Sequence, residues 1–181
     1  MRNSTAKASR GDSGTTTTTM NSASRVPKNH ELVEFVGCLD EAQVVLGFAA
    51  VEAHTQKLDE VYQCLIWMQR SLFNAGILTM ETANEQLQNE WSWNEQLTEV
   101  EKFCSTFALQ EPLRSFILPG GSELAARIEL ARVAIRRLER SYCACNNQGM
   151  DALPFLNRLS TLAFVLARHS NEVLEVPETL L

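Results

Sequence analysis

The chain has 181 residues, of which 45% are hydrophobic and 21% charged, a composition that suits one packed domain with a short tail. Its net charge of −6 argues against a nucleic-acid partner, because affinity for a phosphate backbone needs a broad surplus of Lys and Arg. The five cysteines form an odd set without a Cys-x-x-Cys pair, so neither a disulfide framework nor a protein-bound metal is expected. The longest apolar run, residues 44–51, is too short to span a membrane, and we expect a cytoplasmic protein without membrane contact.

Residues 1–28 lack hydrophobic periodicity, which predicts a loop or flexible arm. Within it, the stretch 11–16 (Gly-Asp-Ser-Gly-Thr-Thr) offers backbone N–H groups and hydroxyls that could hold phosphates. The stretch is not a P-loop, since no lysine follows its second glycine. Lys28 is a second candidate phosphate contact, or else a solvated charge ahead of a helix. The Ser/Thr-rich composition also resembles a transit peptide, but the first motif begins at Ser9 and leaves little to remove.

From Asn29 onward, apolar residues recur at helical spacing. The pattern predicts helices over residues 29–53, 56–78, 93–107, 122–145 and 151–173, and no strand. Pro119 and the two glycines after it separate the third helix from the fourth, whereas Pro154 falls in the first turn of the last helix, where proline is tolerated. The sequence therefore predicts an all-α fold, an antiparallel five-helix bundle over residues 29–181 preceded by the arm of residues 1–28.

The helix predicted over 122–145 carries a charged arc. Five of its side chains fall within about 100° of the helix circumference. They are Glu129, Arg132, Arg136, Glu139 and Arg140. Arginine outnumbers lysine there, and a guanidinium fork suits phosphate oxygens. Because an apolar Phe-Ile-Leu-Pro run leads into this helix, the arc suggests a buried wall, but spacing alone leaves a solvated charged face equally open.

Four stretches together resemble one known family, in order and approximate spacing. They are 11–16 (Gly-Asp-Ser-Gly-Thr-Thr); 25–28 (Arg-Val-Pro-Lys) with 37–41 (Gly-Cys-Leu-Asp-Glu) and 46–47 (Leu-Gly); 116–122 (Phe-Ile-Leu-Pro-Gly-Gly-Ser) with 131–132 (Ala-Arg) and 136–140 (Arg-Arg-Leu-Glu-Arg); and 155–160 (Phe-Leu-Asn-Arg-Leu-Ser) with 164–168 (Phe-Val-Leu-Ala-Arg). The family is that of the ATP:cob(I)alamin adenosyltransferases of the propanediol-utilisation type. The third stretch is the most specific, and residues 80–112 resemble the family only in helical character.

The resemblance implies a homotrimer with ATP bound at the subunit interface. The implied ATP-binding residues are Ser9, Arg10, Gly11, Thr16, Thr17, Lys28, Arg136, Arg137, Glu139, Arg140 and Asn157. Arg132 would pair with Asp40 across the subunit boundary. Phe116 would lie beneath the corrin and displace the lower axial ligand of cobalt, which makes Arg132, Arg136 and Phe116 the implied catalytic residues.

The implied reaction needs no nucleophile from the protein. Cob(I)alamin itself attacks the 5′ carbon of ATP and expels triphosphate, and no Ser/His/Asp or Cys/His arrangement is visible in the sequence. The protein would align the two substrates and stabilise the departing triphosphate with arginines, Lys28 and Mg²⁺. A cob(II)alamin reductase and a B12-dependent acceptor enzyme are the implied partners.

The chain departs from the family pattern at residues 8–10 (Ala-Ser-Arg), Glu129, Leu138 and Thr161, and residues 42–43 (Ala-Gln) also differ. These departures leave a second hypothesis open, a catalytically weak paralogue that binds ATP or cobalamin as a carrier, sensor or partner subunit. An unrelated helical interaction module is a third. A di-iron bundle enzyme is disfavoured because Glu-x-x-His pairs are absent from the sequence.

Overall fold

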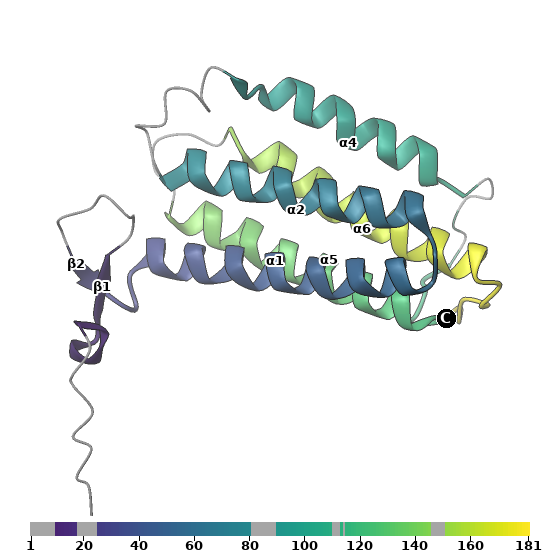
Figure 1. The fold of residues 1–181 in the computed structure, drawn as a ribbon, viewed down its shortest axis with the longest axis horizontal. Helices are drawn as coiled ribbons and strands as arrows, with labels where there is room; N and C mark the ends of the chain where they lie inside the picture. The colour runs from purple at the N-terminus through teal and green to yellow at the C-terminus, as the bar shows by residue number, and fades with distance from the viewer. Residues whose placement is uncertain (1–9, 18–24, 81–89, 110–112, 114, 146–150) are drawn as a thin grey trace, which may run out of the picture.

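The computed structural model describes residues 10–17, 25–80, 90–109, 113, 115–145 and 151–181. In these ranges five α-helices run side by side with alternating direction (Figure 1). They are α1 (Glu31–Thr55), α2 (Asp59–Met80), α4 (Trp93–Phe107), α5 (Glu123–Cys145) and α6 (Leu153–Val173). The predicted antiparallel five-helix bundle is confirmed, with each helix within a few residues of its expected bounds.

The core forms where α1, α5 and α6 pack along most of their lengths, with α2 and α4 completing the bundle. Alanines with little or no exposure line the facing sides of α1 and α5, which lets these two helices approach closely. Larger apolar side chains, such as Leu46, Ile135 and Leu159, are fully buried and fill the space between the helices. α5 and α6 are thereby held as a fixed pair, and a site built on both helices has a rigid base.

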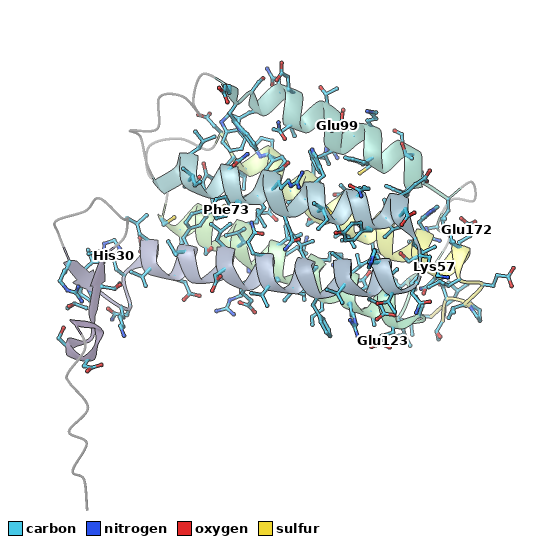
Figure 2. All side chains as sticks on the ribbon, in the orientation of Figure 1. His30, Lys57, Phe73, Glu99, Glu123 and Glu172 are labelled. Atoms are coloured by element: carbon cyan, nitrogen blue, oxygen red, sulfur yellow. The ribbon has the colours of Figure 1, made fainter. Side chains whose placement is uncertain are left out.

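Helix ends carry the expected signals. The hydroxyl of Ser122 accepts a hydrogen bond from the N–H of Ala125, 3.1 Å away, and so caps the start of α5. Pro154 lies in the first turn of α6, as the sequence predicts. Figure 2 labels His30 where α1 begins and Glu123 where α5 begins, at opposite ends of the bundle, so the two packed helices are antiparallel.

The expectation that the chain contains no strand is wrong within the N-terminal arm. A 3₁₀ turn (Arg10–Ser13) leads into β1 (Thr15–Thr17), which pairs antiparallel with β2 (Arg25–Pro27). Strands of three residues are too short to show an alternating pattern, and the β-branched threonines supply the preference for extended backbone. Figure 1 shows this hairpin beyond the start of α1, at one end of the bundle.

None of the helices in the described ranges combines the length and apolar character needed to cross a membrane.

Candidate functional site

The arm brings two predicted phosphate contacts together. The Lys28 Nζ lies 3.5 Å from the point where a β-carbon on Gly11 would be, so the ammonium group covers the glycine. The backbone N–H of Lys28 donates to the carbonyl of Gly14, at 2.9 Å. Gly14 has a φ of 74°, a left-handed conformation that turns the chain into β1. The structure thus places Lys28 on the loop that also carries Thr16 and Thr17. Ser9 and the side chain of Arg10 fall outside the described residues.

The charged arc on α5 divides into a half-buried part and an exposed part. Arg132 and Glu129 are 24% and 12% exposed and form an ion pair in which the Arg132 Nε lies 2.6 Å from a Glu129 carboxylate oxygen. One and two turns further along, Arg136 and Arg140 are exposed. The expectation of a buried wall therefore holds at Glu129 and Arg132 and is wrong for Arg136 and Arg140 in the single chain. Two exposed guanidinium groups are open to a ligand or a second subunit.

Asn157 on α6 adds a polar group beside this arc. Its side-chain amide donates to the carboxylate of Glu139 on α5, at 3.1 Å. The bond orients the amide and joins the two helices at the level of Arg136 and Arg140. From Arg132 to Arg140 the helix rises by about 12 Å, so these groups form an elongated strip along α5. We refer to Arg132, Arg136, Glu139, Arg140 and Asn157 as the α5 strip.

Arg137 is not brought into the α5 strip. Its guanidinium donates to Glu41 at 2.8 Å and to Glu34 at 2.9 Å, and both acids lie on α1. Hydrogen bonding from Arg137 lowers the pKa of the Glu34 carboxyl below its ordinary value. The structure thus uses Arg137 to tie α5 to α1, and its predicted contact with ATP stays a prediction.

Phe116 stands at the other end of α5, in the loop that precedes the helix. Its side chain is 83% exposed, which excludes a role as a core aromatic. An aromatic ring this exposed is available to contact a ligand or a partner. Asp40 is exposed on α1. The predicted Arg132–Asp40 pair across a subunit boundary stays a prediction, and within the single chain Arg132 is paired with Glu129.

Sequence reasoning missed the residues that fix the Phe116 loop. Asn171, buried on α6, accepts from the N–H of Ser122 at 2.8 Å and donates to the carbonyl of Gly120 at 3.0 Å. Gly121 has a φ of 95°, and a β-carbon there would come within 2.5 Å of the Asn171 amide. The Phe-Ile-Leu-Pro-Gly-Gly pattern predicted only a break. The asparagine that pins this break lies 50 residues later, beyond the reach of any local pattern.

A second missed feature is the ion pair between Arg168 and Glu178. The Arg168 Nε and Nη2 each lie 3.0 Å from a Glu178 carboxylate oxygen, and the two side chains are 18% and 17% exposed. The Arg168–Glu178 and Glu129–Arg132 pairs, together with residues 117–120, line a cavity of about 50 Å³. Arg168 falls in the fourth motif stretch, but nothing in the sequence points to Glu178 as its partner.

The described cysteines are poorly suited to act as nucleophiles. Burial raises the pKa of the thiols of Cys38, Cys64, Cys104 and Cys145, so these groups stay protonated near neutral pH. Cys143 is exposed but lies near the end of α5, about two turns beyond Arg136. The geometry favours binding and alignment of ligands over covalent catalysis by the protein.

Comparison with known proteins agrees with this geometry. The family described as cobalamin adenosyltransferase matches residues 6–170. A corrinoid adenosyltransferase of Mycobacterium tuberculosis is 37% identical over 175 residues, covering 89% of this chain and 86% of the relative. The corrinoid adenosyltransferase of Mus musculus is 30% identical over 168 residues, covering 88% and 70%.

Among solved structures, a phenylalanine-to-histidine variant of a PduO-type ATP:corrinoid adenosyltransferase from Lactobacillus reuteri, complexed with cobalamin and ATP, has a similar fold. Its TM-score is 0.80 at 28% sequence identity, with 95% of this chain and 94% of that chain covered. An arginine-to-lysine variant of the Lactobacillus reuteri enzyme, complexed with ATP, aligns with a TM-score of 0.79.

Proposed function

The chain belongs to the cobalamin adenosyltransferase family and is an enzyme that transfers the adenosyl group of ATP to a corrinoid; from this premise we propose that the α5 strip holds the triphosphate and that Phe116 lies beneath the corrin. One observation carries the proposal. Arg136 and Arg140 are exposed on α5 beside the oriented Asn157 amide of α6, and the exposed Phe116 lies in the loop that precedes α5.

The chemistry assigns the reacting groups to the substrates. The electron pair on Co(I) of cob(I)alamin attacks the 5′ carbon of ATP, a Co–C bond forms, and the C5′–O bond breaks with its electrons leaving on triphosphate. The protein holds the two substrates in line, because proximity and orientation replace a chance encounter in solution. It also stabilises the charge that develops on the leaving group.

The α5 strip supplies that stabilisation. Arg136 and Arg140 present guanidinium groups whose planar forks match phosphate oxygens. Glu139 holds the Asn157 amide in place through the 3.1 Å bond, which leaves an oriented amide beside the arginines. Arg132, held by Glu129 at 2.6 Å, is the residue of the strip nearest the start of α5, where the Phe116 loop joins the helix, so we expect it to lie closest to the reacting carbon. The catalytic residues we propose are Arg132, Arg136 and Phe116.

Mg²⁺ fits this site as a companion of the triphosphate. The ion commonly keeps most of its ligands as water and phosphate oxygens, with one or two carboxylates from the protein. In the described ranges no three His, Cys, Asp or Glu side chains gather in a way that could hold a metal on their own. Glu139 is a carboxylate within the α5 strip, and we expect it to face the Mg²⁺ side of the bound triphosphate.

The arm completes the ATP site in this proposal. Lys28 and the loop at residues 11–17 offer an ammonium group, backbone N–H groups and hydroxyls, while Ser9 and Arg10 stay predicted members of the loop. Among the described elements, β1 packs against β2 and the 3₁₀ turn, and neither strand packs extensively against α5 or α6. The hairpin projects beyond the bundle (Figure 1). We therefore expect the arm of one subunit to cover the α5 strip of another.

A homotrimer would bring these parts together, and the α1–α5 side of the bundle is the surface we expect it to use. Five apolar residues there are between 47% and 65% exposed. They are Val44, Phe48 and Val51 on α1 with Leu130 and Val133 on α5. Arg127 joins the two helices at this surface, with its guanidinium carbon 3.8 Å from the centre of the Phe48 ring. An apolar surface of this kind beside a charged site is typical of a subunit contact.

Light scattering tests the assembly. Leu130→Asp should convert the trimer to monomers and reduce ATP binding, because the arm then has no neighbour to cover. Phe73→Asp is the matched control, since Phe73 is an exposed aromatic on α2, a helix that carries none of these five residues (Figure 2). A trimer that survives Leu130→Asp would move the contact elsewhere on the bundle.

The transfer itself is tested by mixing the protein with ATP and cob(II)alamin under reduction and following the adenosylcobalamin spectrum. The product should form with release of triphosphate, and omission of ATP should prevent it. Binding of both substrates without product would instead support the catalytically weak paralogue. We further propose that the enzyme acts in the cytoplasm and works with a cob(II)alamin reductase and a B12-dependent acceptor enzyme.

A further inference from the structure

The position of Phe116 cannot come from packing of its own side chain. That side chain is 83% exposed, so few of its atoms touch the rest of the chain. Asn171 pins the loop at Gly120 and Ser122, several residues further along. The backbone around Phe116 must therefore be fixed by something else if the ring is to stay in one place.

Residues 174–181 supply that fixation. The N–H of Leu181 donates to the carbonyl of Phe116 at 2.9 Å, and the N–H of Leu118 donates to the carbonyl of Thr179 at 2.9 Å. Between these two bonds, Ile117 and Leu180 form an antiparallel bridge. Residues 116–118 are thus one side of a short ladder whose other side is residues 179–181. We call residues 174–181 the strap.

The strap is itself anchored at two points. Where α6 ends, Glu175 adopts a φ of 55° and the N–H of Val176 donates to the carbonyl of Asn171 at 2.9 Å, which reverses the chain toward the Phe116 loop. Further along, the carboxylate of Glu178 accepts two hydrogen bonds from the Arg168 guanidinium of α6. A half-buried, bidentate arginine–carboxylate pair fixes the relative orientation of the two side chains as well as their distance.

We propose that the strap, locked by the Arg168–Glu178 pair, holds Phe116 against the lower face of the corrin, and that Glu178 is a positioning residue for the transfer. This inference rests on the proposed place of Phe116 beneath the corrin. Glu178 does not reach the substrate in this scheme. It acts through Arg168, the strap ladder and the backbone of Phe116, so its loss should affect cobalt coordination and leave ATP affinity unchanged.

Two variants test the strap at different points. Glu178→Gln removes the negative charge that pairs with Arg168 and so weakens the hold on the strap. Because hydrogen bonds between charged groups are strong, we expect this loss to lower kcat about ten-fold or more. Leu181→Pro removes the single N–H that binds the Phe116 carbonyl, and Leu181→Ala is its matched control because it keeps that N–H. Glu101→Gln is the control for Glu178→Gln, since Glu101 pairs with Arg158 in an exposed ion pair at 3.7 Å.

The measurement is the electron paramagnetic resonance spectrum of cob(II)alamin with ATP and each protein, beside kcat, the KM for ATP and the melting temperature. The wild type, Leu181→Ala and Glu101→Gln should give a four-coordinate signal. Glu178→Gln and Leu181→Pro should give mostly a five-coordinate signal and a lower kcat, with the KM for ATP within two-fold of the wild type.

Phe116→Ala separates this inference from the function on which it rests. If Phe116→Ala gives the five-coordinate signal while both strap variants stay four-coordinate, Phe116 keeps its role and the strap has none. If Phe116→Ala itself stays four-coordinate, the proposed place of Phe116 is wrong. Equal loss in Leu181→Ala and Leu181→Pro would assign the effect to the Leu181 side chain and overturn the role of its N–H.

Discussion

The proposed site depends on two segments outside the helices, the arm and the Phe116 loop, and they are held in opposite ways. The described parts of the arm, residues 10–17 and 25–28, are held by the hairpin bonds between β1 and β2 and by Lys28, which covers Gly11. The loop at residues 115–122 is held by groups from elsewhere in the same subunit, the Asn171 amide and the strap. The difference separates two tasks. The Phe116 loop is preorganised within its own subunit, whereas in our proposal the arm takes its working place only through contact with ATP and a neighbouring subunit.

The largest effect is expected from a substitution within the α5 strip, the proposed triphosphate site. Arg136→Ala should lower kcat/KM strongly, because it removes roughly 2–4 kcal/mol of transition-state stabilisation, the usual loss when one preorganised donor to a developing negative charge is removed. The bundle should stay folded, because Arg136 is exposed. Steady-state kinetics with circular dichroism check both statements. Arg158→Ala on α6 is the control, and an Arg136→Ala enzyme with near wild-type rate would remove Arg136 from the site.

A sharper test of the comparison is deletion of residues 1–14. ATP affinity should fall by about ten-fold or more, since each factor of ten corresponds to 1.4 kcal/mol and several phosphate contacts are lost together. Helix content and melting temperature should be almost unchanged, because the described part of the deleted segment, residues 10–14, packs mainly against β1. Calorimetric titration with ATP and thermal melting measure the two quantities. Failure of the truncated protein to fold would make the arm a structural element.

Asn171→Ala probes the opposite loop and should give the reverse pattern. It leaves the N–H of Ser122 and the carbonyl of Gly120 without their partner, which should lower the free energy of unfolding by about 1–2 kcal/mol. ATP affinity should hold, since the α5 strip is untouched. Asn94→Ala, at an exposed position on α4, is the control in a denaturant titration. A stability equal to that of the wild type would show that the strap alone fixes the loop.

Local sequence patterns were sufficient for the bundle and for part of the site. The 3.6-residue periodicity and Pro119 located the five helices, and the arginine-rich arc contains the four α5 residues of the α5 strip. Those signals are contained within one helix or one break. The hairpin escaped prediction because strands of three residues carry no period of their own.

Contacts between distant segments account for the remaining misses. Arg137 follows Arg136 in the sequence but points about 100° away from it around α5, so it meets Glu34 and Glu41 on α1, two partners that no local pattern indicates. The strap pairs residues more than 60 positions apart through backbone groups. Almost every residue type carries these groups, so the sequence does not indicate such a pairing. Glu178 was invisible for the same reason, since only the folded chain brings it to Arg168.

The close fit between Gly121 and Asn171 also bears on how this chain can change by mutation. A side chain at position 121 must adopt a φ near 95° and meet the Asn171 amide at 2.5 Å, so the first substitution there is strained in two ways. Shortening residue 171 would relieve the collision but release the loop that the amide pins. Neither position can vary alone without loss, and the two are therefore epistatic. We therefore expect Gly121 and Asn171 to be retained or replaced together among relatives of this chain.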